Sequence, residues 1–184
     1  PYIMGMSGFT GHLTSRFHAD LDEWRNSEIF SYPDLDAITS ITVEHPTDPA
    51  TGFTIEYKGG NELMLKDNSS KPVDMDSLAV KDFLLQFKKL HYEYIDRAAS
   101  RNTRDSVLTS TPHTTITISD RSGGARSMKL WMLKPAAEGV DEAGTPLRYD
   151  VNRMHGLVAD TVLVVVQRHL FDRVTLPLSD LRRD

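Results

Sequence analysis

The 184-residue chain contains no cysteine. Disulfide bonds, thiolate metal sites and cysteine nucleophiles are therefore excluded, although this absence does not decide between a reducing and an oxidising compartment. Long apolar runs are missing too. The longest, Val162–Val166, is far shorter than the roughly 18 residues that a membrane-spanning helix needs. We expect no span within this chain, and membrane attachment only through a segment upstream of Pro1.

A surplus of basic residues is also absent, because 21 Lys and Arg stand against 26 Asp and Glu and the net charge is -5. Sequence-independent binding of a phosphate backbone needs a basic surface, so we expect no nucleic-acid partner. A hydrophobic fraction of 39% is ordinary for a soluble globular protein. We predict a lead-in segment with a short helix over residues 1–30 and a single domain over residues 31–184.

The stretch Val73–Arg97 has the strongest helical pattern in the chain. Its apolar residues recur at the i, i+3, i+4, i+7 spacing of one helix face: Val80, Phe83, Leu84, Phe87, Leu90 and Tyr94. Asp74 or Asp76 can accept hydrogen bonds from the first free N–H groups of such a helix. We predict one long amphipathic helix over Asp76–Tyr94 that nucleates the core.

Short alternating runs surround this helix. Three of them, Ile41–His45, Phe53–Tyr57 and Glu62–Lys66, are joined by turn-rich connectors and predict a three-stranded meander. Two others, Thr114–Ser119 and Ala125–Leu133, flank the turn DRSGG and predict a hairpin. The predicted fold class is α+β, a mainly antiparallel sheet of meander and hairpins packed on the long helix.

Four segments have less definite patterns. The apolar residues of Asp150–Val158 fit either a helix or a strand, whereas Thr161–Gln167 is β-branched and predicts a buried strand. Ala98–Ser110 is a polar stretch to which we assign no element. Lys134–Tyr149 is a loop rich in proline, glycine and acidic residues, long enough to be either functional or mobile.

Potential metal-binding and titrating groups have simpler structural explanations. His18, Asp20 and Asp22 are of metal-ligand type, but the spacing supplies no further ligand, and a solvated acidic segment is the simpler interpretation. We therefore predict no metal site and no cofactor. His91 lies beside the apolar face of the predicted helix, where a hydrogen-bonded structural histidine is favoured over a titrating switch.

The candidate catalytic sets do not satisfy the geometry that their chemistry requires. Ser106 lacks a surrounding G-x-S-x-G motif, and His113 and Asp120 fall at opposite ends of one predicted strand, roughly 20 Å apart. Asp141 and Glu142 resemble a glycosidase pair in type only, because adjacent residues do not define a separation across a sugar. We predict no catalytic residues.

The second tryptophan belongs to a candidate partner surface. If Met128, Leu130 and Met132 face the core, Trp131 and Leu133 face the other side of the same strand. A sheet covered by one helix leaves its opposite face exposed unless something packs on it. Trp131 and Leu133 are therefore either a partner-binding surface or part of a second internal layer.

The order of these segments resembles that of a known family. The matching segments are WRNSEIF, DAITSITVEHP, FTIEYKGGNELML, LAVKDFLLQFKKLHYE, DSVLTSTPHTTITISDRSG, and TVLVVVQ with LPLSDL. On these, over most of Trp24–Leu181, the chain resembles uncharacterised bacterial envelope proteins of domain-of-unknown-function family four-three-four-zero. Its YDVNRM segment is similar to a Bacteroidota-type variant. The layout also resembles that of gliding-motility auxiliary proteins of ABC transporters. Leu63–Leu65 stands where the family often has a tryptophan.

The resemblance implies a location and a neighbourhood rather than a reaction. It implies the periplasmic side of the envelope, anchorage to the cytoplasmic membrane by a span upstream of Pro1, and a strand at Met154–Val158 paired with Thr161–Gln167. We expect a non-enzymatic envelope module that contacts other envelope proteins, such as a transporter or a gliding- or secretion-type assembly. The alternatives are a ligand-binding or ABC-transporter accessory domain and, third, a hydrolase.

Overall fold

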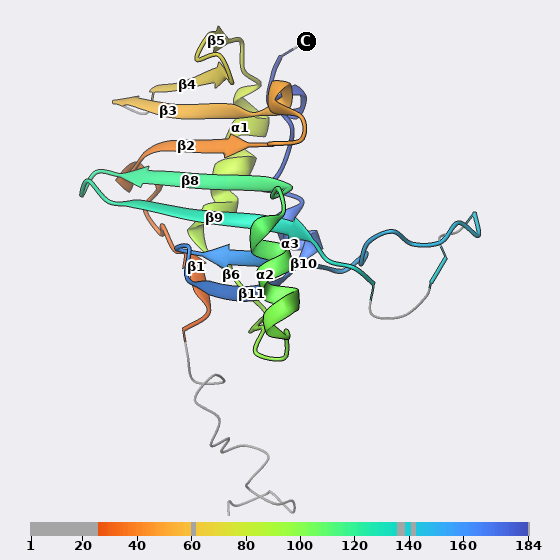
Figure 1. Ribbon diagram of the computed structural model, residues 1–184. Coiled ribbons are helices and arrows are strands. Elements are labelled where there is room, and N and C mark those ends of the chain that lie inside the picture. The colour runs from red at the N-terminus through yellow and green to blue at the C-terminus, as the bar shows by residue number, and fades with distance from the viewer. Residues whose placement is uncertain (1–25, 60–61, 136–138, 141–142, 184) are drawn as a thin grey trace, which may run out of the picture.

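The computed structural model describes residues 26–59, 62–135, 139–140 and 143–183. Within these residues, nine strands form one sheet in the order β5-β4-β3-β2-β8-β9-β10-β11-β7, and β1 and β6 form a separate pair (Figure 1). All neighbouring strands described are antiparallel. The strands are β1 (Glu28–Phe30), β2 (Ile38–Glu44), β3 (Phe53–Gly59), β4 (Glu62–Asp67), β5 (Pro72–Val73), β6 (Leu90–His91), β7 (Tyr94–Ile95), β8 (Thr114–Asp120), β9 (Ala125–Met132), β10 (Arg153–Val158) and β11 (Val162–Gln167).

The helical elements are short. They are α1 (Ser77–Leu85), α2 (Arg101–Thr109) and α3 (Arg168–Phe171), with 3-10 turns η2 (Leu35–Ala37), η3 (Pro49–Thr51), η4 (Gln86–Lys88) and η5 (Leu178–Asp180). None of the helices in the described ranges has the length and apolar content to cross a bilayer.

The predicted α+β class, with its mainly antiparallel sheet, is confirmed. Strands β2, β3 and β4 form the expected meander, and β8 and β9 form the expected hairpin. The ambiguous Asp150–Val158 segment contains β10, which pairs with β11 as the family resemblance implied. The turn between these two strands puts Ala159 and Asp160 at positive φ, 48° and 55°, which suits a tight hairpin.

The prediction of one long helix over Asp76–Tyr94 is wrong. Asp76 is the N-cap, as one of the two expected candidates, but α1 ends at Leu85 and η4 at Lys88. The backbone of Lys89 is extended, and β6 and β7 follow, pairing with β1 and β11 respectively. Leu90 and Tyr94 satisfy a strand pattern as well as a helical one, so sheet pairing overrides the helical period.

Two further segments differ from expectation. The polar stretch Ala98–Ser110 contains α2, which was not predicted. Residues 28–30, expected at the end of a short helix, form β1, because Glu28 and Phe30 pair with β6. Ile29 and Phe30 are buried in the main core. The rest of that expected helix and the remainder of the lead-in, residues 1–25, lie outside the described range.

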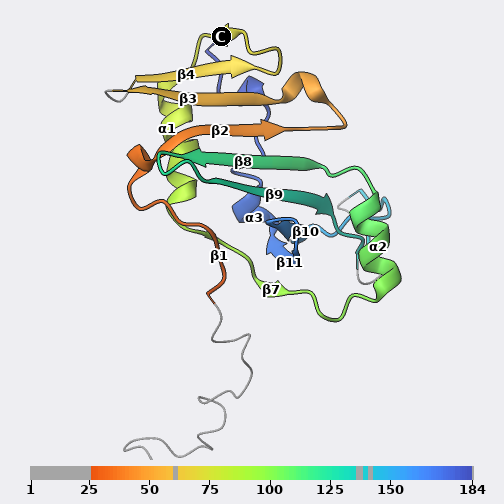
Figure 2. The same ribbon diagram turned by 60° about the vertical axis from the view of Figure 1, so that its left-hand side comes forward.

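The two faces of the sheet are covered differently. Figures 1 and 2 show α1 on one face and α2 at one end of the other. The main core joins the inward side chains of the sheet to the buried stripe of α1: Val80, Phe83 and Leu84, continued by Phe87 in η4. On the α2 side the buried apolar residues outside that core are Trp131, Leu157, Leu163 and Val165. This second layer is small, and the cleft described next lies beside it.

Candidate binding cleft

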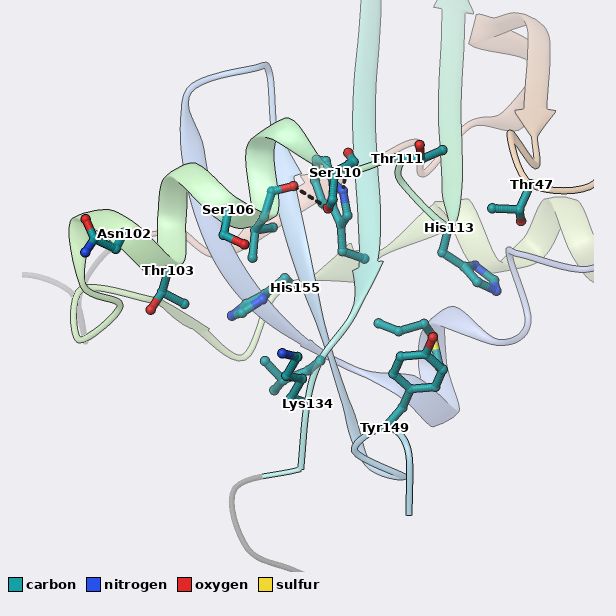
Figure 3. A pocket seen from close by; sticks show the side chains of 14 residues that line it. Thr47, Asn102, Thr103, Ser106, Ser110, Thr111, His113, Lys134, Tyr149 and His155 are labelled. Atoms are coloured by element: carbon teal, nitrogen blue, oxygen red, sulfur yellow. Dashed lines mark hydrogen bonds between the residues drawn. The ribbon is translucent and has the colours of Figure 1, made fainter. Parts of the chain in front are cut away.

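A cleft of about 840 Å³ opens on the sheet face opposite α1 (Figure 3). It is bounded by α2, the end of β9 and the two ends of the connection from β9 to β10. Hydroxyl, amide, imidazole and ammonium groups predominate among its lining residues, which are Thr47, Asn102, Thr103, Ser106, Val107, Ser110, Thr111, His113, Trp131, Met132, Leu133, Lys134, Tyr149 and His155. The cleft thus combines many polar side chains with an exposed lining to which apolar atoms contribute the larger part.

Helix α2 forms one wall of the cleft through hydrogen bonds rather than burial. Ser100 is its N-cap and accepts from the Thr103 N–H at 3.1 Å. The Trp131 indole N–H donates to the Ser110 carbonyl at 3.1 Å, and the Arg104 guanidinium donates to the Thr161 carbonyl at 2.9 Å. No residue of α2 is buried. Its cleft-facing residues are Asn102, Thr103, Ser106 and Val107, whose spacing puts them on one side of the helix, and only Val107 is apolar.

His155 is the most buried polar group of the cleft, with 5% of its surface exposed. Its Nε2 lies 3.0 Å from Asp96 Oδ2. A carboxylate only accepts, so Nε2 holds the hydrogen of this bond. Asp96 Oδ1 accepts from the Ala99 N–H at 2.9 Å, just before α2 begins. The same carboxylate thus fixes both the imidazole and the turn that leads into α2.

The register of the sheet brings Asp96 to His155. His155 of β10 pairs with Val165 of β11, which pairs with Tyr94 of β7. Alternate residues of a strand share a face, so Asp96 lies on the same side as Tyr94 and His155. The Asp96 N–H donates to the Leu163 carbonyl at 3.1 Å, which holds this position after β7 ends.

A second histidine, His113, lies at the other side of Trp131 and belongs to a chain of hydrogen bonds. The Leu176 carbonyl only accepts, so His45 Nε2 donates to it at 3.2 Å. Neutral His45 then accepts at Nδ1 from the buried Thr114 hydroxyl, 3.2 Å away. The Thr114 oxygen in turn accepts from His113 Nδ1 at 2.7 Å. In this neutral arrangement His113 Nε2 keeps a free lone pair.

The charge state of His113 is influenced by its surroundings. Partial burial lowers the pKa of His113, and the neighbouring His45 side chain and the charge of Arg168 lower it further, while Asp172 opposes them. Figure 3 shows His113 and Tyr149 on the same side of β9, away from α2. This part of the cleft therefore favours a neutral imidazole that accepts a hydrogen bond.

Lys134 and Tyr149 stand at the two ends of the connection between β9 and β10. The Asp150 N–H donates to the Leu133 carbonyl at 2.8 Å, which joins these ends. The described parts of the connection project from the body of the fold (Figure 1). The expected long loop thus contributes to the cleft by its ends.

The candidate partner residues Trp131 and Leu133 both line the cleft. Trp131 is 5% exposed and belongs to the small second layer under α2, whereas Leu133 is partly exposed. The side chains of β9 alternate between the two faces of the sheet as predicted, because Met128 and Leu130 are in the main core and Trp131 is not. Partner binding at these residues stays a prediction.

The other candidate residues are not brought together into one site. Ser106 and His113 line the cleft, but Asp120 lies at the far end of β8. His91 is exposed on β6 rather than on a helix. The remaining candidates, His18, Asp20, Asp22, Asp141 and Glu142, lie outside the described residues. Within the described ranges, no three His, Asp or Glu side chains gather as a metal site requires.

Sequence reasoning missed Asp96, His155 and the polar face of α2. The strand RMHGLV offered one signal, a histidine among the apolar residues that follow Arg153 in β10. Asp96 and His155 are 59 residues apart, and their pairing has no local pattern. Comparisons with protein-family models, curated proteins and solved structures found no match to this chain.

Proposed function

We propose that this chain is a non-enzymatic envelope module that acts through protein contacts, holding an extended segment of a partner protein in the cleft beside α2. The observation that carries this proposal is the cleft's polar lining, distributed from Asn102 and Thr103 on α2 to Tyr149 beyond β9. A polypeptide backbone presents donors and acceptors along its length, and hydroxyl and amide side chains can pair with both.

The arrangement of the polar groups favours binding over bond cleavage. Catalysis of hydrolysis needs a nucleophile, a base and an oxyanion site that converge on one reacting atom. Here His155 is hydrogen-bonded to Asp96, while His113 is bonded to Thr114 on the other side of Trp131. The two imidazoles thus serve different parts of an open surface.

The proposal includes the periplasmic side of the envelope as the location and a membrane span upstream of Pro1 as the anchor. Its support is the order of segments over most of Trp24–Leu181, which resembles bacterial envelope proteins. Other envelope proteins, including a transporter or a gliding- or secretion-type assembly, are the corresponding partner classes.

The alternative is a ligand-binding or ABC-transporter accessory domain. One observation favours it: the cleft volume of about 840 Å³ falls within the usual size of small-molecule sites. A hydrolase has less support, because Ser106 and His113 line the cleft but Asp120 does not.

Site-specific photo-crosslinking tests the proposal. Benzoylphenylalanine replaces Ser106, which is exposed on the cleft wall, in the full-length protein expressed in its native host. We expect adducts of protein size after irradiation, identified by mass spectrometry. The matched control replaces Lys81, which is exposed on α1 on the opposite face of the sheet.

A cleft-filling variant completes the test. Thr103→Trp, on the exposed wall of α2, should remove the adducts formed from position 106 by occupying the space of the bound segment. Equal adducts from positions 106 and 81, adducts that persist with the filled cleft, or none at all would contradict the proposal.

A further inference from the structure

His155 has one ring nitrogen fixed and one free. Nε2 donates to Asp96 at 3.0 Å, and no hydrogen bond joins Nδ1 to the described residues. Nδ1 is not among the buried atoms that lack a partner, so it keeps contact with solvent. The side chain is 5% exposed, and the small part of its surface that remains open lies in the cleft. This nitrogen can therefore form a hydrogen bond with a group that enters the cleft.

The charges around the cleft have one sign. Lys134 lines it, and no Asp or Glu appears among its described lining residues, although acidic residues outnumber basic ones in the chain. Asp96 lies behind His155, with one oxygen occupied by the imidazole and the other by the Ala99 N–H. Asp96 is hydrogen-bonded to His155, and Lys134 lines the same cleft, to which α2 contributes only uncharged side chains. The nearby charged residues of β9 and β10 are in ion pairs, Lys129 with Asp160 and Arg153 with Glu93.

These features fit an anionic group. A carboxylate that enters between Lys134 and His155 would receive the ammonium hydrogens and, when Nδ1 is protonated, an imidazolium N–H. Asp96 then balances the imidazolium charge from behind, so the ring donates one N–H to each of two carboxylates. The Ser106 hydroxyl on α2 lines the same cleft and can pair with the peptide backbone, whereas the Thr103 hydroxyl is already bonded to that of Ser100 at 2.8 Å.

We propose that the segment held in the cleft presents an Asp or Glu side chain, whose carboxylate is bound by Lys134 and by His155 Nδ1. This inference rests on the proposed function, because it specifies the chemistry of the bound segment.

Two capped tripeptides serve as probes, acetyl-Ala-Glu-Ala-amide and its uncharged counterpart acetyl-Ala-Gln-Ala-amide. Binding is followed on the ¹⁵N-labelled protein by the imidazole resonances of His155 and the indole N–H of Trp131. We expect the glutamate peptide to bind at least about fivefold more tightly than the glutamine peptide, as one charge-assisted contact implies.

Variants separate the two contacts. Lys134→Met, at an exposed position where folding is not at risk, should remove most of the preference for glutamate, while Lys81→Met on the far face leaves it intact. His155→Gln should weaken the binding of the glutamate peptide more than that of the glutamine peptide. Equal binding of the two peptides, or an unchanged preference in Lys134→Met, would overturn the inference.

Further outcomes distinguish this inference from the proposed function. If the crosslinks from position 106 persist but both peptides bind equally, the protein-binding function stands and the acidic specificity falls. If sodium acetate binds as tightly as the glutamate peptide, the site is one for a small carboxylate and the peptide assignment is overturned. Loss of both the crosslinks and the peptide preference refutes both proposals.

Discussion

The α1 face of the sheet and the α2 face are built from different kinds of side chain. On the first, aromatic and aliphatic residues interlock, as in the edge-to-face contacts of Phe83 with Phe53 and Phe87 at centroid distances of 5.4 and 5.2 Å. On the second, α2 buries no residue and is held by hydrogen bonds from Trp131, Arg104 and its own cap. Both helices have nine residues and side-chain N-caps.

The difference indicates that the α1 face provides stability, whereas the α2 face exposes polar groups. Apolar burial provides most of the free energy of folding, so the α1 face should determine global stability. Hydrogen bonds to solvent-accessible groups contribute little net free energy but fix direction. The α2 face can therefore expose polar groups to a ligand without weakening the core, and local opening of α2 should be easier than global unfolding.

The largest expected effect is that of Phe83→Ala. Phe83 is 2% exposed, and its removal leaves a cavity between α1 and the sheet, which should lower the free energy of unfolding by about 3–5 kcal/mol. Denaturant unfolding measures this. Leu78→Ala on the same helix is the control, since Leu78 is 69% exposed and should cost under about 0.5 kcal/mol. Similar losses would mean that α1 does not anchor the core.

Asp96→Ala should have the next largest effect. It leaves the N–H groups of His155 and Ala99 without their acceptor, at a cost of about 1–3 kcal/mol, and should loosen the start of α2. Chemical denaturation together with hydrogen exchange of the α2 amides measures both effects. Asp105→Ala, at an exposed position on α2, serves as the control. No difference between the two variants would refute the positioning role of Asp96.

Removing the two N-caps compares the helices directly. Asp76→Ala removes an acceptor for the Leu78 and Ala79 N–H groups, and Ser100→Ala removes one for Thr103. Each should cost about 1 kcal/mol of helix stability. We expect Asp76→Ala to lower the global free energy of unfolding, and Ser100→Ala to speed hydrogen exchange within α2 alone. Equal global effects would show that the two helices are equally coupled to the core.

The smallest expected effect is the pH dependence due to His113. Its pKa is lowered in the folded state, so the unfolded chain binds more protons as the pH falls below about 6.5, the ordinary histidine value. The corresponding stability is present above that pH and is lost on acidification through the lowered pKa. The free energy of unfolding, measured across this pH window, should therefore depend less on pH in His113→Gln than in the unsubstituted protein. An unchanged slope in the variant would assign the pH dependence to other groups.

The sequence-based predictions were more accurate for helix α1, which buries an apolar stripe, than for α2, which buries no residue. The stripe from Val80 to Phe87 located α1, because its burial is periodic, but Leu90 and Tyr94 fitted a strand equally well and the helix was extended too far. Helix α2 was missed because it buries nothing and so has no apolar period. Alternation along β9 correctly separated Trp131 from Met128 and Leu130, and this singled out the part of the chain where the cleft lies.

By itself, the sequence determined the longer strands β2, β3, β4, β8, β9 and β11, the turns of the meander and of the β8–β9 hairpin, and the core face of α1. Each follows from local alternation, helical spacing or a capping side chain within a few residues. Only the tertiary structure decided where the helix ends and what surrounds the cleft. Asp96 meets His155 because β7 joins the sheet beyond β11, and α2 lies over Trp131 because the same turn leads into it. Those contacts depend on strand pairing across distant parts of the chain, which no local pattern encodes.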